Sequence, residues 1–74
     1  MTVDVELFGQ LGISRERNQS LEIESPLPVN EVALLVGVQP EDIGLAIIDG
    51  AQVSIKEKVP TTCQLSLFPP MSGG

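Results

Sequence analysis

The stretch CQLSLFPPMSGG, residues 63–74, joins a strand pattern to an extended tail. In its first half Leu65 and Leu67 alternate with outward positions, and this period of two predicts a half-buried strand. Pro69 and Pro70 follow, and proline rings hold the backbone extended. The stretch therefore predicts a last strand that continues into a stiff, outward-pointing tail.

The same alternation predicts two strands near the N-terminus. Residues 2–8 place three aliphatic side chains on one face, and residues 20–24 place Leu21 and Ile23 on one face. Residues 9–19 contain glycines and a polar run, and we interpret them as the loop that joins two antiparallel strands. The prolines of residues 25–28 then break the sheet, because proline cannot donate to a strand ladder.

One helix is predicted, over residues 29–37. Four residues at helical spacing form its core-facing side: Val29, Val32, Leu35 and Val36. Ala33 and Leu34 are expected on the opposite side. Gly37 stands where a C-terminal glycine cap belongs, whereas Pro28 is a poor N-terminal cap.

The second half of the chain predicts a hairpin and the final strand. Asp49-Gly50 lies between apolar runs within residues 44–55, which is a strong turn signal. Residues 56–61 are interpreted as a polar connection. If the last strand pairs beside and parallel to the first, the fold is α+β. It is then a ubiquitin-like β-grasp, a mixed sheet of four to five strands with one main helix across one face. Residues 1–68 would form this domain and residues 69–74 the tail.

The composition excludes several kinds of active site. The chain has no histidine, which excludes the serine and cysteine nucleophile arrangements that need a histidine base. The single cysteine, Cys63, cannot supply a zinc site, so we expect no metal. We interpret Cys63 as a partly buried residue at the start of the last strand, not as a nucleophile.

The charge balance favours protein partners. Ten acidic residues against four basic ones give a net charge of −6, and nucleic-acid binding needs a cationic surface, so it is not expected. An acidic surface suits a basic protein partner, and it equally serves solubility. No signal peptide or membrane-spanning stretch is visible, so we expect a cytoplasmic protein that does not enter a membrane.

The paired glycines limit what the tail can do. Gly73 and Gly74 have no side chains, so the tip fits a channel too narrow for other residues. Its carboxylate is ionised and reacts only after activation, most economically as an acyl-adenylate made from ATP by another enzyme. The alternative is a disordered terminus or a linker remnant. The strand, the prolines and the glycines together favour the first interpretation.

These residues resemble a known family. LFPPMSGG (67–74), with LAIIDGAQV (45–53) and the short helix before it, resembles the ubiquitin-like sulfur carriers of the MoaD/ThiS type. The resemblance is greatest to the small subunit of molybdopterin synthase, whose members commonly end in Phe-Pro-Pro-x-x-Gly-Gly. Sulfur carriers of thiamin synthesis usually lack the paired prolines, so Pro69 and Pro70 favour the molybdopterin branch.

The resemblance implies a non-catalytic sulfur-carrier protein that binds no cofactor itself. An E1-like adenylating enzyme would use ATP to activate Gly74, and a sulfur donor protein would supply the sulfur of a thiocarboxylate. The large catalytic subunit of molybdopterin synthase would accept the tail, and the sulfur would enter a pterin dithiolene that binds molybdenum or tungsten. The partner-binding tail would consist of Pro69, Pro70, Met71, Ser72 and Gly73.

Phe8 and Phe68 are the only aromatic residues, and both are expected on the outer face of the sheet. If the first and last strands are parallel neighbours, the two rings meet where the tail begins. We interpret them as anchors of a partner interface, because aromatic anchors dominate such surfaces. The alternative is that the loop of residues 9–18 covers one or both rings.

Three other functions remain open from the sequence. The first is a sulfur carrier for the synthesis of thiamin or cysteine or for another pathway. The second is a ubiquitin-like interaction module without tail chemistry. The third is a modifier that is joined to other proteins through its Gly-Gly end. Deleting Gly74 distinguishes the carriers from the interaction module, because only the carriers need the terminal carboxylate.

Overall fold

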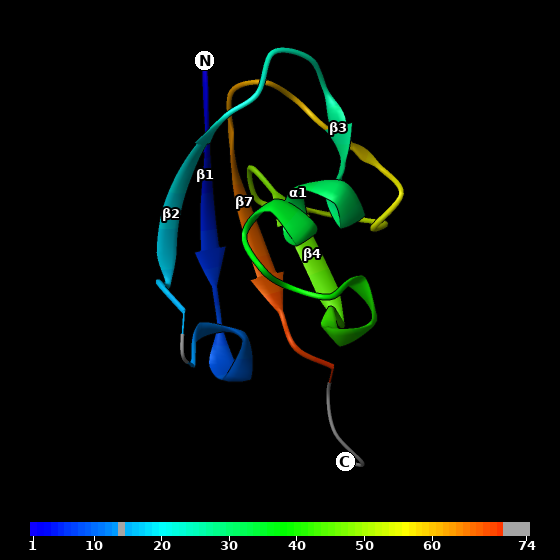
Figure 1. Cartoon of the computed structure of the whole chain (residues 1–74). Helices are drawn as coiled ribbons and strands as arrows, with labels where there is room; N and C mark the ends of the chain where they lie inside the picture. Colours follow the sequence, from blue (N-terminus) through cyan, green and yellow to red (C-terminus); the bar gives the residue numbers. More distant parts are fainter. Residues whose placement is uncertain (14, 71–74) are drawn as a thin grey trace.

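The computed structural model describes residues 1–13 and 15–70, and their main feature is a five-stranded mixed sheet in the order β2-β1-β7-β4-β5. The strands of this sheet are β1 (Thr2–Leu7), β2 (Asn18–Glu22), β4 (Leu45–Ile48), β5 (Ala51–Val53) and β7 (Cys63–Phe68). Helix α1 (Val29–Leu35) lies across one face of the sheet (Figure 1). The predicted β-grasp fold is confirmed.

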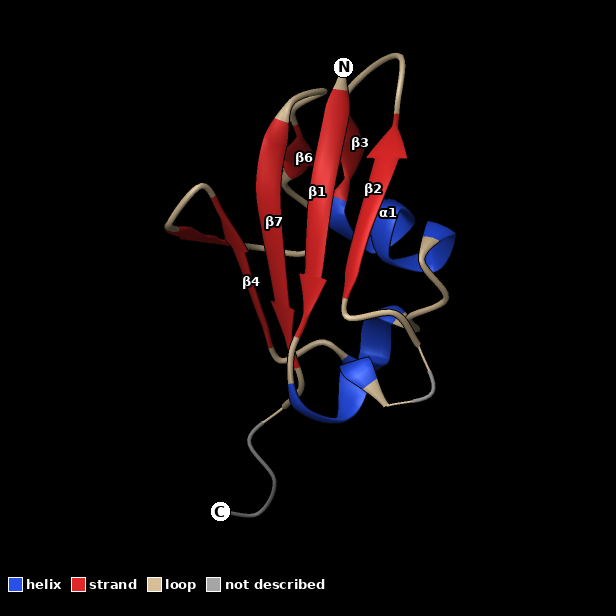
Figure 2. Cartoon of the chain, turned by 90° about the vertical axis from the view of Figure 1, so that its left-hand side faces the viewer, coloured by secondary structure: helices blue, strands red, loops and turns tan. Residues whose placement is uncertain are grey.

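The central pair of strands, β1 and β7, is parallel, as predicted (Figure 2). Their register pairs Val5 with Leu65 and Leu7 with Leu67, and all four side chains are almost completely buried. The two period-two patterns therefore meet in phase, so that each strand buries its aliphatic face against the helix side of the sheet. Both strands also end at the same end of the sheet, and the tail begins there.

The helix is shorter than predicted, and one residue of its predicted core face is wrong. Leu35 is 59% exposed, whereas Ala33, expected on the opposite side, is fully buried. The buried side chains Val29, Val32, Ala33 and Val36 follow the i, i+3, i+4, i+7 rule. Leu35 lies six residues after Val29, which places it away from this stripe.

The helix ends at a glycine cap, as predicted. Gly37 has a φ of +85°, and its N–H donates to the Leu34 carbonyl at 3.1 Å. The Val38 N–H donates to the Ala33 carbonyl at 2.8 Å, which completes a Schellman motif. The chain reverses here because only glycine adopts this backbone angle without strain.

Two segments that were interpreted as non-strand pair with each other. β3 (Leu27–Pro28) and β6 (Lys58–Val59) form a separate two-stranded sheet, and Val59 is fully buried. The carbonyl of Glu57 accepts from the Val29 N–H at 2.9 Å, and this bond replaces the missing side-chain cap of α1. Residues 25–28 and 56–61 thus hold the start of the helix, which their local sequences did not indicate.

The remaining elements agree with prediction in type and differ in boundary. Asp49 (φ +49°) and Gly50 (φ +87°) form the β4–β5 turn, with the left-handed angles that a two-residue hairpin needs. β2 begins two residues earlier and ends two residues earlier than predicted, although Ile23 beyond it is buried as expected. The loop after β1 contains a short 3-10 helix, η1 (Gly9–Gly12), and a second, η2 (Pro40–Asp42), precedes β4.

Candidate functional site

The candidate site lies at the end of the sheet where β1 and β7 finish, which we call the tail end. Phe8 directly follows β1, and Phe68 is the last residue of β7. Their rings are stacked, with centroids 4.3 Å apart and an interplanar angle of 11°. The Phe8 N–H donates to the Leu67 carbonyl at 3.0 Å, which holds the two strand ends together. The predicted meeting of the two rings is confirmed, and each ring is half-buried.

A third apolar side chain extends this stack, and the sequence analysis did not single it out. Leu45 pairs directly with Phe68 across the antiparallel β4–β7 ladder, so both side chains point to the same face. By alternation this is the outer face, because Leu67 and Ala46 face the core. The only sequence signal was that residues 45–48 are apolar at every position, on both faces of the strand.

An apolar hollow of about 520 Å³ opens beside the stacked rings. It lies between the start of β4 and the first tail residues, and its walls are Phe8, Gly9, Gly44, Leu45, Phe68, Pro69 and Pro70. A concave apolar surface next to two half-buried aromatic rings suits an apolar side chain of a protein partner. The interface role of the rings itself remains a prediction.

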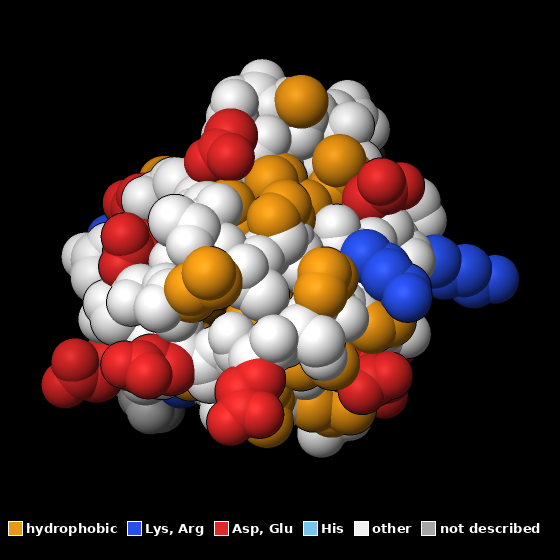
Figure 3. Space-filling view, turned by 90° about the horizontal axis from the view of Figure 1, so that it is seen from above, with side chains coloured by type: hydrophobic (Ala, Val, Ile, Leu, Met, Phe, Trp, Pro, Cys, Tyr) orange, Lys and Arg blue, Asp and Glu red, His pale blue; other side chains and the backbone are white. Residues whose placement is uncertain are grey.

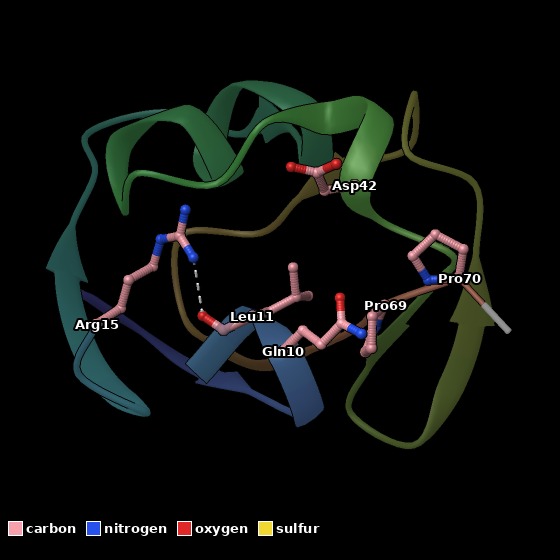
Figure 4. Close-up of a pocket in the computed structure, with 6 residues that line it drawn as sticks. All are labelled: Gln10, Leu11, Arg15, Asp42, Pro69 and Pro70. Atoms are coloured by element: carbon pink, nitrogen blue, oxygen red, sulfur yellow. Dashed lines mark hydrogen bonds between the residues drawn. The ribbon is translucent and has the colours of Figure 1, made fainter. Parts of the chain in front are cut away.

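A second hollow, of about 300 Å³, is also lined by the same prolines, and polar and apolar atoms contribute about equally to its surface (Figure 4). Its lining residues are Gln10, Leu11, Arg15, Asp42, Pro69 and Pro70. The Arg15 side chain donates from Nε to the Gly37 carbonyl at 3.0 Å and from a terminal nitrogen to the Leu11 carbonyl at 3.2 Å. Arg15 thereby ties the loop after β1 to the end of α1. Pro69 and Pro70 line both hollows.

The described part of the tail, Pro69 and Pro70, packs against two glycines, Gly9 and Gly44, that were not predicted as site residues. The Gly44 N–H donates to the Phe68 carbonyl at 2.8 Å, and the backbone of Pro69 and Pro70 crosses directly over Gly44. The Pro69 ring rests against Gly9. Pro69 is half-buried and Pro70 is exposed.

The remaining tail residues lie outside the described residues. Met71, Ser72 and Gly73, predicted to bind a partner, and Gly74, predicted to be adenylated and thiocarboxylated, therefore stay predictions. The division into a domain of residues 1–68 and a tail of residues 69–74 also stays a prediction, although β7 does end at Phe68.

Cys63 lies at the opposite end of β7 from the tail. Its thiol is buried and donates a weak hydrogen bond to the Pro60 carbonyl, with 3.7 Å between sulfur and oxygen. Burial, followed by the negative charges of Asp49 and Asp4, raises the pKa of the Cys63 thiol above its usual range. The thiolate is the nucleophile, so this environment is the opposite of one that activates a cysteine.

Charge is distributed over the surface of the described residues without a buried ion. None of their polar or charged residues is fully buried, although the Asn30 Oδ1 atom is shielded from solvent and has no hydrogen-bond partner among them. Viewed from the end that carries the N-terminus, acidic side chains are spread around the rim and basic ones gather mainly on one side (Figure 3). Within residues 1–13 and 15–70, no three His, Cys, Asp or Glu side chains are arranged to hold a metal ion. No helix in that part of the chain is long and apolar enough to cross a membrane.

Comparisons with known proteins place the fold. SAMP1 from Haloferax volcanii superposes with a TM-score of 0.72 over 100% of both chains, at 22% sequence identity. This is a ubiquitin-like fold. No family model matches the chain, and no curated protein matches its sequence.

Proposed function

We propose that this chain is a sulfur-carrier protein that acts as the small subunit of a molybdopterin synthase. The observation that carries the proposal is the tail end itself. The paired prolines leave the sheet beside the stacked rings of Phe8 and Phe68, at the end where β1 and β7 both finish. A docking surface and the base of a Gly-Gly tail are thus adjacent, which is the arrangement a carrier needs.

The carrier supplies a carboxylate, and its partners supply the catalysis. The Gly74 carboxylate attacks the α-phosphorus of ATP bound by an E1-like adenylating enzyme, which releases pyrophosphate and leaves an acyl-adenylate. A sulfur donor protein then supplies sulfur at the oxidation level of hydrosulfide, which attacks the acyl carbon, forms the C–S bond and displaces AMP, so that one carboxylate oxygen is exchanged for sulfur. No histidine or activated cysteine of this chain is required, in agreement with the composition and the raised pKa of Cys63.

Two surfaces have separate tasks in this proposal. The rings and Leu45 bind the partner through the apolar hollow, and Pro69 and Pro70 direct the tail away from the sheet. The large catalytic subunit of the synthase takes the thiocarboxylate and transfers its sulfur to a pterin precursor, forming the dithiolene. The paired prolines favour this acceptor over those of thiamin or cysteine synthesis.

An intact-mass spectrum tests the proposal. The purified chain is incubated with its E1-like enzyme, ATP and a sulfur donor, beside a variant that lacks Gly74. We expect a mass gain equal to one oxygen exchanged for sulfur, present in the full chain and absent from the shortened one. The spectrum of the untreated protein also checks the requirement that Gly74 bear the terminal carboxylate.

Other results would redirect the proposal. If neither an adenylate nor a thiocarboxylate appears with an active partner, the interaction-module function is favoured. If the chain is found attached to lysines of other proteins, the Gly-Gly end serves conjugation. If the thiocarboxylate forms but no large subunit of a molybdopterin synthase accepts it, another sulfur pathway is the acceptor.

A further inference from the structure

The close passage of the tail over Gly44 is a feature that the fold alone does not require. A Cβ built on Gly44 would lie 2.7 Å from both the Pro69 carbonyl oxygen and the Pro70 nitrogen, and closer still to the Pro70 Cα. Outside their own residue and its two chain neighbours, real Cβ atoms essentially never approach heavy atoms more closely than 3.0 Å. Gly44 is not one of the glycines with positive φ, so its backbone angles do not demand glycine. Only the contact with the tail requires a glycine at position 44.

Gly9 supports the first of these prolines. It is the first residue of η1 and has a φ of +57°, and a Cβ there would lie 3.0 Å from Pro69 Cγ. The two glycines lie 35 residues apart in the sequence, at the start of η1 and directly before β4. The base of the tail is therefore seated between two bare backbone surfaces, Gly9 against the proline ring and Gly44 against the proline backbone.

We propose that Gly44 is a positioning residue that sets the direction in which the tail leaves the sheet. The inference rests on the proposed carrier function, because direction matters only if the terminus must reach a partner's reactive centre. A side chain at Gly44 would push Pro69 and Pro70 off their seat. Proline rings keep the chain stiff, so a displacement at the base is carried toward the terminus instead of being absorbed locally.

This assignment predicts a specific pattern of loss in Gly44→Ala. The stacked rings and Leu45 remain, but Gly44 and the two prolines also wall the apolar hollow, so the concentration of activating enzyme needed for half-maximal rate is measured separately from the rate at saturating enzyme. The rate of adenylation at saturating enzyme falls by about tenfold or more, because a misplacement of roughly 1 Å in a reacting group has effects of this order. A purely structural role would instead lower the melting temperature without changing the rate measured well below it.

The control variant is Gly50→Ala. Nothing lies within 4 Å of a Cβ at Gly50, and its positive φ makes the substitution strained, so stability falls without any contact with the tail. We expect its adenylation rate to match that of the unchanged protein. A Gly50→Ala chain as slow as Gly44→Ala would show that lost stability explains both results.

Two measurements decide the inference. The first is the nuclear Overhauser effect between the Gly9 α-protons and the Pro69 ring protons. It shows whether Pro69 packs against Gly9 in the protein alone, without any partner. The second is pyrophosphate release with saturating E1-like enzyme and ATP. We expect Gly44→Ala to lose the first signal and to slow the second, and Gly50→Ala to retain both.

The outcomes separate this inference from the proposed function. The positioning role is wrong if Gly44→Ala keeps the Gly9–Pro69 signal. It is also wrong if the variant loses this signal but is adenylated at an unchanged rate, or if the variant fails to fold. If the unchanged protein shows the signal but is never adenylated, the carrier function is wrong and the positioning role falls with it.

Pro70→Gly gives a further check, since a flexible tail base lets the tail bend around a Cβ on residue 44. In that background Gly44→Ala should slow adenylation much less, and equal slowing in both backgrounds would contradict the role.

Discussion

The two ends of β7 carry the same alternating pattern and have opposite properties. At its start Cys63 is buried, hydrogen-bonded to Pro60 and kept protonated by its surroundings. At its end Phe68 is stacked and half-buried, and it lines the apolar hollow at the base of the tail. The outward neighbour of the first end is Gln64, which is exposed and polar, whereas the second end presents an aromatic ring.

The difference shows that burial pattern alone does not locate a site on this strand. Inward residues serve the core along its whole length. A candidate surface arises only where the outward residue is apolar and where the neighbouring backbone, at Gly9 and Gly44, leaves room for the tail. Substitutions along β7 can therefore separate the two kinds of residue.

The largest effect on stability is expected from Leu67→Ala. Leu67 is fully buried between β1 and β4, and truncating such a side chain typically lowers the free energy of unfolding by about 2–5 kcal/mol. Urea denaturation measures the loss. Gln64→Ala, an exposed change on the same strand, should stay within about 0.5 kcal/mol of the unchanged protein. Similar losses in both variants would contradict the assignment of inward and outward faces.

Phe68→Ala tests the outward residue next to it. We expect affinity for the E1-like enzyme or the large subunit to fall at least about tenfold, the size typical of a central aromatic anchor. The stability loss should be smaller than for Leu67→Ala, because the ring is only half-buried and loses one stacking partner, worth about 1 kcal/mol. Isothermal titration calorimetry and urea denaturation give the two values, with Gln64→Ala as the control. Unchanged affinity with lost stability would mean that the stack serves the fold alone.

The smallest effect is expected at the other end of β7, from the Cys63 thiol. Because its pKa is raised in the folded state, its contribution to stability is present below the pKa of the unfolded thiol. That contribution is lost as the pH rises through the folded pKa. As the pH rises above the ordinary thiol pKa of about 8.5, the free energy of unfolding should therefore fall more steeply than in Cys63→Ala.

Asp49→Asn sharpens this last test. Asp49 is the larger electrostatic cause of the raised pKa, and asparagine keeps an oxygen that accepts from the Gln64 N–H, a bond of 2.8 Å in this structure. Asparagine also tolerates the positive φ of the turn. The alkaline loss of stability should shrink but persist, because burial is the larger cause. An unchanged pH profile would show that Asp49 does not influence the thiol.

Much of the fold was predictable because its signals are local. The alternation of β1 and β7, the Asp49-Gly50 turn and the Gly37 cap each depend on residues within a few positions of one another. The misplaced Leu35 and Ala33 were a local error in the helical repeat, whereas the missed strands β3 and β6 and the helix start depend on a distant segment. Pro28 is a poor helix cap by itself, and the carbonyls that replace the cap come from residues 55–57.

The residues of the candidate site also fall into a group that the sequence indicated and a group that it did not. The sequence indicated Phe8, Phe68 and the prolines from their types and from the tail motif. It did not indicate Leu45, which joins the rings through the β4–β7 register, or Gly44, whose importance comes from a backbone 25 residues further along the chain.

By itself, then, the sequence determined the five strands of the main sheet, the helix with its glycine cap and a composition that points to the tail as the predicted reactive part. The parallel pairing of the first and last strands was only a condition of the predicted fold, and the sheet topology confirmed it. Periodicity and side-chain chemistry are properties of neighbouring residues, so they can be read along the chain. Only the tertiary structure decided which outward residues share one surface and where the tail base rests. Those depend on strand register and on the closest approach of backbones, and neither quantity exists until the sheet has formed.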